Sequence, residues 1–272
     1  MISNRRSFLK KQFILGGSVM LGSSLNSLAT ISKNIAETNG SQSLNLLCTS
    51  DLAKLNNYRQ SINSFELSTI NLFAGNISNA NETTLQQLGC INYHAVNFSL
   101  DKQGVNLAAM LPDLNRTAIN FVNCNYQFES KAMQQIVLPY LTLFSGNKKI
   151  GITGLGAYSN TKGLTVKEPI AALNKIAKHL KNNMNCEKVI CLADFGFDTN
   201  EKLNNLVLAQ ASEYVDAIVG AGANPKNNTA WSYKNAMKQE VLVLANKKDK
   251  RFTNITQITL NQNKHLFNLK NI

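Results

Sequence analysis

Oxygen-bearing side chains follow short apolar runs in the middle of the sequence, and such side chains are the ligands that hard metal ions prefer. Between residues 148 and 225 the chain contains KKIGITGLGAYSN, KVICLADFGFDTN and DAIVGAGANP, and each apolar run leads into Gly, Asp or Asn. This pattern is typical of a buried strand that ends in a loop. Because α/β proteins carry their chemistry in the loops at the carboxyl ends of strands, we expect these loops to carry the functional site.

The elements that must position these loops alternate between strand and helix. A helix is expected to begin at Pro169, where the missing N–H does least harm, and to bury Leu173, Ile176 and Leu180. Strands are expected at 44–50, 68–74, 93–97, 118–125, 136–143, 149–155, 188–192, 216–220, 241–245 and 255–260. Further helices are expected at 79–88, 102–111 and 200–213. The 272 residues suit a single α/β domain.

Several motifs occur along the chain in a fixed order. Upstream are LCTSDLAKL, NLFAGNISN, LGCINYHAVNFSLD and INFVNCN, and downstream are NKKIGITGLGAYSN, VICLADFGFD and DAIVGAGANP. In order and spacing this set resembles the N-terminal domain of the 5′-nucleotidase branch of the calcineurin-like metallophosphoesterases, from about residue 44 to about residue 260. The resemblance implies a four-layer αββα sandwich, in which helices flank two sheets.

The resemblance also implies where a two-metal site would lie, and the upstream motifs depart from it. Asp51 matches the aspartate of the family's D-x-H motif, but Ala53 stands in place of the histidine. Asn76 replaces the bridging aspartate of the G-D motif. Asn97 matches the asparagine of G-N-H-E, whereas Phe98 replaces the histidine that would protonate the leaving oxygen.

The downstream motifs lack their histidines as well. Asp194 replaces the histidine after the central strand, and Gly222 and Asn224 replace the last two histidines. The three histidines that the chain does contain lie elsewhere and are expected to be structural or solvated: His94, His179 and His265. The departures imply that the phosphoesterase chemistry is lost, and we assign no catalytic residue.

The aligned positions that keep an oxygen atom allow two interpretations. If the resemblance holds, Asp51, Asn76, Asn97, Asp194 and Asn224 converge and could form a weak site for a hard divalent cation such as calcium or magnesium. Alternatively they are capping and turn residues, which are common at strand ends. Beyond such a weakly bound divalent cation, no cofactor is expected.

The first 29 residues have the features of an export signal. A basic segment precedes a short apolar region diluted by Gly and Ser, and a small-x-small cleavage site ends at Ala29. The segment resembles a twin-arginine signal, carried by Arg5, Arg6, Phe8 and Leu9. An ordinary secretory leader or a retained anchor is the alternative.

This signal sets the expected domains and location. We expect a signal peptide over 1–29, a linker over 30–42 and a metallophosphoesterase-like domain over 43–272. The twin-arginine translocase would export the protein to the periplasm or cell envelope. No transmembrane span is expected in the mature chain, because the apolar region of the leader is too short for one.

Charge and cysteine content exclude several classes. The net charge of +12 includes four basic residues of the leader, and the densest basic run elsewhere is 247–251. We expect this run to form a solvated turn rather than a nucleic-acid patch, so no nucleic-acid partner is expected. Five cysteines, an odd number, with no C-x-x-C motif exclude a complete disulfide framework and a thiolate zinc site.

Three functions follow, in order of preference. The first is a non-catalytic binding or scaffold subunit, whose partner would be a separately encoded protein like the C-terminal domain of nucleotidases. The second is an active exported phosphoesterase with a remodelled oxygen-ligand metal site. The third is an adhesin or carbohydrate-binding module that uses the altered loops.

Overall fold

The computed structural model describes residues 34–35, 44–55, 69–100, 104–198, 200–223, 230–246, 256–260 and 270–271. The expected export signal, Asn224, the basic run 247–251 and His265 lie outside these ranges. Two residues of the expected linker, Asn34–Ile35, form the short strand β1. Within the described ranges no helix is both long enough and apolar enough to cross a membrane.

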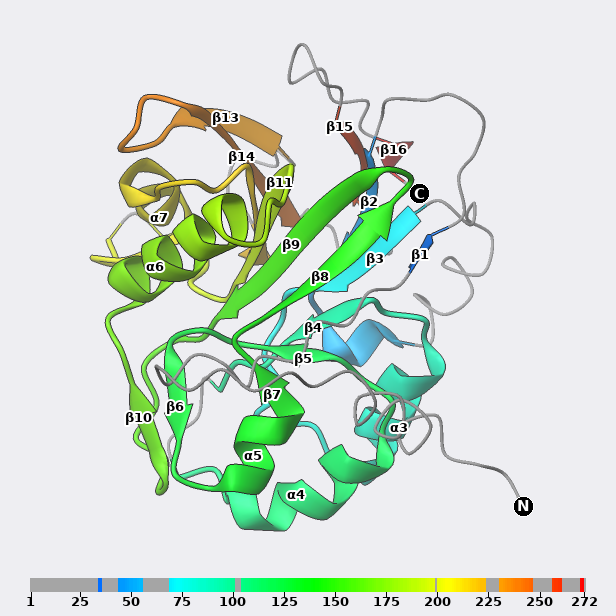
Figure 1. Ribbon diagram of the computed structural model, residues 1–272. Helices are drawn as coiled ribbons and strands as arrows, with labels where there is room; N and C mark the ends of the chain where they lie inside the picture. Colours follow the sequence, from blue (N-terminus) through cyan, green and yellow to red (C-terminus); the bar gives the residue numbers. More distant parts are fainter. Residues whose placement is uncertain are drawn as a thin grey trace, which may run out of the picture.

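Two seven-stranded sheets form the centre of the protein (Figure 1). The first has the order β16-β15-β2-β3-β4-β5-β7. Its strands from β2 to β7 run parallel, and β15 is antiparallel to β2. The bounds are β2 Leu44–Thr49, β3 Thr69–Phe73, β4 Ala95–Asn97, β5 Phe121–Val122, β7 Val137–Leu138, β15 Thr256–Leu260 and β16 Lys270–Asn271.

The second sheet has the order β1-β8-β9-β11-β12-β14-β13. The four strands β9, β11, β12 and β14 run parallel, and β13 is antiparallel to β14 at one edge. The bounds are β8 Tyr140–Ser145, β9 Lys148–Leu155, β11 Lys188–Ala193, β12 Ala217–Ala223, β13 Ala230–Lys234 and β14 Glu240–Asn246. A separate antiparallel pair consists of β6 Tyr126–Phe128 and β10 Leu164–Val166.

Alternate residues of the strands form a core between the two sheets. Leu46 and Leu72 from the first sheet and Ile190 and Leu242 from the second belong to one fully buried apolar cluster. Their sequence neighbours, such as Leu47, belong to a cluster on the opposite face. This alternation follows from the two-residue period of a strand. On the other face of the second sheet, Val189, Cys191 and Ile218 are fully buried against helices.

Helices pack on the outer faces of both sheets. Buried residues of three helices share a cluster with the first sheet, and those of two others share one with the second. The first group consists of α3 Glu82–Cys90, α4 Leu107–Arg116 and α5 Lys131–Ile136; the second consists of α6 Pro169–Asn182 and α7 Asn205–Ala211. A short 3-10 helix, η2, spans Leu52–Lys54. The expected α/β class is confirmed.

Local hydrogen bonds explain why α4 and β5 have other bounds than the sequence predicts. Helix α4 begins five residues later than expected at 102, because the Asn106 side chain accepts a hydrogen bond from Ala109 N at 3.1 Å and caps the first turn. The helix also continues through Pro112, where we expected it to end. The strand expected at 118–125 is only two residues long, because the Asn123 side chain accepts from Asn125 N and Tyr126 N and turns the chain.

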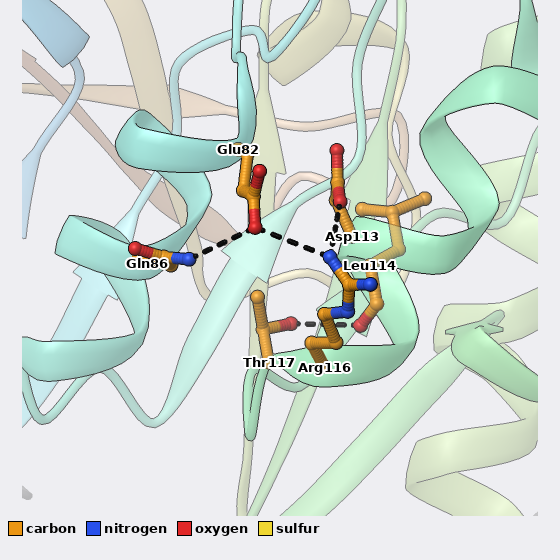
Figure 2. Close-up of polar contacts among 6 residues, drawn as sticks. All are labelled: Glu82, Gln86, Asp113, Leu114, Arg116 and Thr117. Carbon is orange, nitrogen blue, oxygen red and sulfur yellow. Dashed lines mark hydrogen bonds and ion pairs between the residues drawn. The ribbon is translucent and has the colours of Figure 1, made fainter.

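Surface contacts join α3 to α4 (Figure 2). The Arg116 guanidinium pairs with Glu82 at 3.1 Å and with Asp113 at 3.4 Å. Gln86 also donates to Glu82, and Thr117 donates to the Leu114 carbonyl at the end of α4. Because the Arg116 side chain is 65% exposed, water screens these pairs and each contributes at most about 1 kcal/mol.

A more buried ion-pair network closes the amino end of the second sheet. Asp216 pairs with Lys181 at 2.7 Å and with Lys188 at 3.5 Å, and it accepts a hydrogen bond from Val189 N at 2.7 Å. The side chain of Asp216 is 19% exposed, so the network is largely shielded from water. It therefore fixes the start of β11 against α6.

Candidate functional site

The carboxyl ends of the parallel strands β2 and β3 lie side by side. Just beyond Thr49 and Phe73, the last paired residues of β2 and β3, Ala74 N donates to the Thr49 carbonyl at 2.8 Å. Next in the chain, Gly75 lies so close to Ser50 that a β-carbon at residue 75 would overlap the Ser50 carbonyl oxygen. Only glycine permits this approach. The two loops therefore leave the sheet together, and Asp51 follows directly in one of them.

Asn97, at the end of β4, links the two sheets. Its side chain is fully buried, and its Nδ2 donates to the Ala74 carbonyl at 3.3 Å and to the Leu155 carbonyl at 2.9 Å. Ala74 belongs to the first sheet's loops, and Leu155 ends β9 of the second sheet. Its Oδ1 has no hydrogen-bond partner among the described residues and packs against Gly154. The carboxyl ends of both sheets thus meet at one edge, which we call the carboxyl edge.

A second link joins the loops after β4 and β11. The buried Ser99 hydroxyl donates to Oδ2 of the half-buried Asp194 at 3.0 Å. In the same region, Ile77 N donates to the Ser99 carbonyl at 2.9 Å, which ties the loop containing Asn76 to the loop after β4. Together with Asp51 and Asn97, these contacts bring Asn76 and Asp194 to the carboxyl edge.

Asp51 caps a turn at this edge. It is exposed, and its Oδ1 accepts from Ala53 N at 3.0 Å as the N-cap of η2. This is the capping role that the second interpretation of the sequence describes. Because the residue is exposed, its carboxylate can still reach a ligand at the surface.

Phe98 does not face the carboxyl edge. Its ring is fully buried in the cluster between the first sheet and helices α3–α5. It makes edge-to-face contacts with Phe121 and Phe128, with ring centroids 5.7 Å and 5.5 Å apart. The residue that the resemblance aligns with the family's histidine is therefore part of the hydrophobic core.

Two of the three histidines form structural hydrogen bonds. Asn71 N donates to His94 Nδ1 at 3.0 Å, directly before β4 and hence at the amino end of this strand. His179 Nε2, on α6, lies 3.1 Å from the Tyr140 hydroxyl. Both imidazoles are engaged in these contacts, in agreement with the structural role expected from the sequence.

Sequence reasoning missed three buried residues that hold the edge together. Both amide atoms of Asn125 bond the backbone of Gly156, each at 2.9 Å, and Asn123 Nδ2 donates to the Phe98 carbonyl at 2.8 Å. The Tyr126 hydroxyl donates to the Ala157 carbonyl at 2.7 Å. The run of Asn123, Cys124 and Asn125 matched a family motif, but a motif does not reveal hydrogen-bond partners. We call the side chains of Asn97, Asn123 and Asn125 the amide network.

Metal ligands of the usual kinds are not grouped together in the described residues. Among them, no group of three or more His, Cys, Asp or Glu side chains is placed to hold a metal ion. Cys124 follows β5 near the edge, but burial raises the pKa of its thiol to about 12, so it does not supply a thiolate at neutral pH. The amide of Asn97 uses its nitrogen to join the sheets, while its Oδ1 has no hydrogen-bond partner among the described residues.

Solved structures of other proteins share this fold. The NAD nucleotidase of Haemophilus influenzae matches with a TM-score of 0.64 and 16% identity over 84% of this chain and 49% of that chain. A 5′-nucleotidase precursor of Thermus thermophilus matches with a TM-score of 0.63 and 16% identity over 84% and 53%. The calcineurin-like phosphoesterase YfkN of Bacillus subtilis matches with a TM-score of 0.50 and 12% identity over 84% and 88%.

No family model and no curated protein matches the sequence. The chain spans about half the length of the two nucleotidases. At these identities the likeness concerns the fold alone, and it agrees with the strand order and the shared carboxyl edge described above. The protein has the metallophosphoesterase fold of the 5′-nucleotidases.

Proposed function

We propose that this protein is a non-catalytic, exported member of the metallophosphoesterase superfamily that acts by binding. The observation that carries the proposal is the position of Phe98, which replaces the family's proton-donating histidine and is buried in the core. An imidazole restored at this position would lie in the aromatic cluster and not at the carboxyl edge. On this proposal, the packing of the domain excludes a general acid at residue 98.

Ligand chemistry supports the same proposal. General acid–base groups contribute about 10²–10⁴-fold to a rate, and metal-bound water supplies the nucleophile in this class of enzyme. Replacing a bridging carboxylate by the neutral amide of Asn76 removes a charge that both ions would share. Loss of a single outer-shell partner already weakens metal binding about 10–100-fold, so loss of several direct ligands should abolish it.

Metal content and hydrolysis test this proposal together. We expect the purified mature protein to contain no stoichiometric manganese, zinc or cobalt and to hydrolyse neither nucleotides nor simple phosphate esters when these ions are added. Turnover that is abolished by Asp51→Ala but not by Asp113→Ala would contradict it. Asp113 is a matched control, because it is a surface aspartate of α4 far from the carboxyl edge in the fold.

A second candidate is an active phosphoesterase with an oxygen-ligand site. The observation that favours it is the placement of two carboxylates, Asp51 and Asp194, at the same edge as the Asn76 and Asn97 amides. Such a set suits calcium or magnesium. Stoichiometric magnesium or calcium together with turnover would favour this candidate, whereas ion binding without turnover would leave the first proposal in place.

Export and partnership are further parts of the proposal. We propose export by the twin-arginine pathway, so that Arg5→Lys with Arg6→Lys should leave precursor in the cytoplasm. Unchanged export of this double variant would favour an ordinary secretory leader. We also propose a partner that resembles the C-terminal domain of nucleotidases, as the resemblance to that family implies. Co-expression with a protein of that kind should yield a complex that survives gel filtration.

A further inference from the structure

Strand β13 lies at an edge of the second sheet. It pairs with β14 on one side, and among the described residues no strand pairs with its other side. Figure 1 shows β13 at the outer rim of the molecule, beyond β14 and beside α7. An edge strand presents backbone N–H and C=O groups that another chain can pair with.

The β13–β14 hairpin also carries large apolar side chains. Trp231 and Tyr233 are half-buried, and Trp231 packs on Phe197 with ring centroids 5.6 Å apart. Met237, in the turn, is 39% exposed. Elsewhere in the described ranges only Tyr158 is an exposed large hydrophobic residue. Trp, Tyr and Met are enriched in protein interfaces, so this hairpin has the composition of a contact surface.

The hydrogen-bonding pattern of the hairpin shows which backbone groups of β13 point away from β14. Asn235 N donates to the Gln239 carbonyl at 2.9 Å, so the backbone groups of Asn235 point toward β14. In an antiparallel pair this direction alternates from residue to residue. The backbone groups of Lys234, Ser232 and Ala230 therefore point away from β14, toward the open side of the edge.

We propose that β13 pairs in antiparallel fashion with β13 of a second copy of this chain, about a two-fold axis at Ser232. In this register Trp231 lies opposite Tyr233 of the second copy, and Tyr233 lies opposite Trp231. Aromatic cross-strand pairs of this kind stabilise sheets. Lys234 lies opposite Ala230, so the only charged side chain of the strand meets no like charge.

The sequence of β13 is self-complementary, which favours a second copy of this chain as its partner. The sequence AWSYK places its two aromatic residues symmetrically about the small, exposed Ser232. In a two-fold interface residue i meets residue j and residue j meets residue i, so pairing about Ser232 brings each aromatic residue opposite the other aromatic residue. The contact is short, so we expect a weak dimer with a micromolar dissociation constant. The inference does not depend on the proposed function.

Sedimentation velocity and fluorescence of the mature protein test this inference. Trp231 is the only tryptophan of the chain, so tryptophan emission reports on β13 alone. We expect the sedimentation coefficient to rise with concentration and the emission to shift to the blue over the same range. Ser232→Pro should remove both changes, because it deletes an outward N–H without breaking a bond to β14. Ser232→Ala keeps that N–H and should associate like the wild type.

Ser232→Lys is a second variant for the case that the proline variant does not fold. It places two lysines opposite each other across the axis, so it should weaken association at low salt and recover part of it at high salt. Circular dichroism establishes that each variant is folded. A wild-type protein that stays monomeric up to its solubility limit overturns the inference. This is also the result expected if other parts of the chain cover the edge of β13. Association that neither Ser232→Pro nor Ser232→Lys weakens also overturns it.

Discussion

Replacing Phe98 by histidine tests whether residue 98 faces the core or the carboxyl edge. Truncation of a buried phenylalanine costs about 3–5 kcal/mol, and each edge-to-face pair, here with Phe121 and Phe128, adds about 0.5–1.5 kcal/mol. An imidazole refills part of the volume, but an unpaired buried polar group costs about 1–3 kcal/mol. We therefore expect Phe98→His to lower the free energy of unfolding by about 3–5 kcal/mol. This is a large share of the roughly 5–15 kcal/mol of a typical domain.

Urea unfolding followed by circular dichroism measures this loss. Phe98→Leu is the matched control, because it keeps an apolar side chain in the cluster and should cost only about 1–2 kcal/mol. Burial disfavours the imidazolium, so the pKa of the new histidine should fall below the ordinary value of about 6.5. The unfolded state then binds more protons than the folded state. The loss of stability should therefore grow as the pH falls below about 6.5.

A small loss would refute this reasoning. If Phe98→His costs less than about 1 kcal/mol and its effect does not change with pH, residue 98 must reach solvent. A histidine could then act as a proton donor at the carboxyl edge. In that case the substitution of one side chain, and not the packing of the domain, would account for the absence of a general acid.

Three further predictions use the same preparations. Asp216→Asn should lower the free energy of unfolding in urea by about 1–3 kcal/mol, because it removes the charge that two half-buried lysines share. Arg116 is exposed, so Arg116→Ala should lower it by at most about 1 kcal/mol. Cys90 is exposed and should be the one thiol that reacts quickly with Ellman's reagent at pH 8, so Cys90→Ser should remove the fast phase. Burial raises the pKa of the remaining thiols and should protect them: Cys48, Cys124, Cys186 and Cys191. Asn97→Ala should cost about 2–4 kcal/mol, while EDTA should leave the unfolding midpoint of the wild type unchanged.

Elements with strong local signals could be predicted from the sequence. Helix α6 spans the expected 169–182, because Glu168 caps it by accepting from Ile170 N and Ala171 N and Pro169 fixes its first turn. The long apolar runs of β2, β3 and β11 fall within one residue of the expected bounds. In contrast, α5 was missed, because six residues are too few to show a helical period, and β13 was missed, because a five-residue edge strand alternates only weakly.

The candidate site could be predicted in position but not in bonding. Parallel strands bring their carboxyl ends to one edge, so the loops of Asp51, Asn76 and Asp194 could be expected there. The bond between Ser99 and Asp194 joins residues that are 95 positions apart, and no local pattern reveals such a contact. Nor does the sequence show which way a residue just beyond a strand points. For that reason the burial of Phe98 required the structure.

The amide network joins the two sheets at the carboxyl edge through neutral hydrogen bonds. In a two-metal centre, charged ligands on neighbouring strands repel each other, and the ions offset this repulsion. Here Asn97 donates to carbonyls of both sheets and Asn125 bonds the Gly156 backbone twice, so neutral hydrogen bonds cross the same junction. Removing the Asn97 amide leaves the Ala74 and Leu155 carbonyls buried without this donor, which costs more than the bonds contribute. These bonds involve no ion, so we expect a chelator to leave the junction intact and the unfolding midpoint to be indifferent to EDTA.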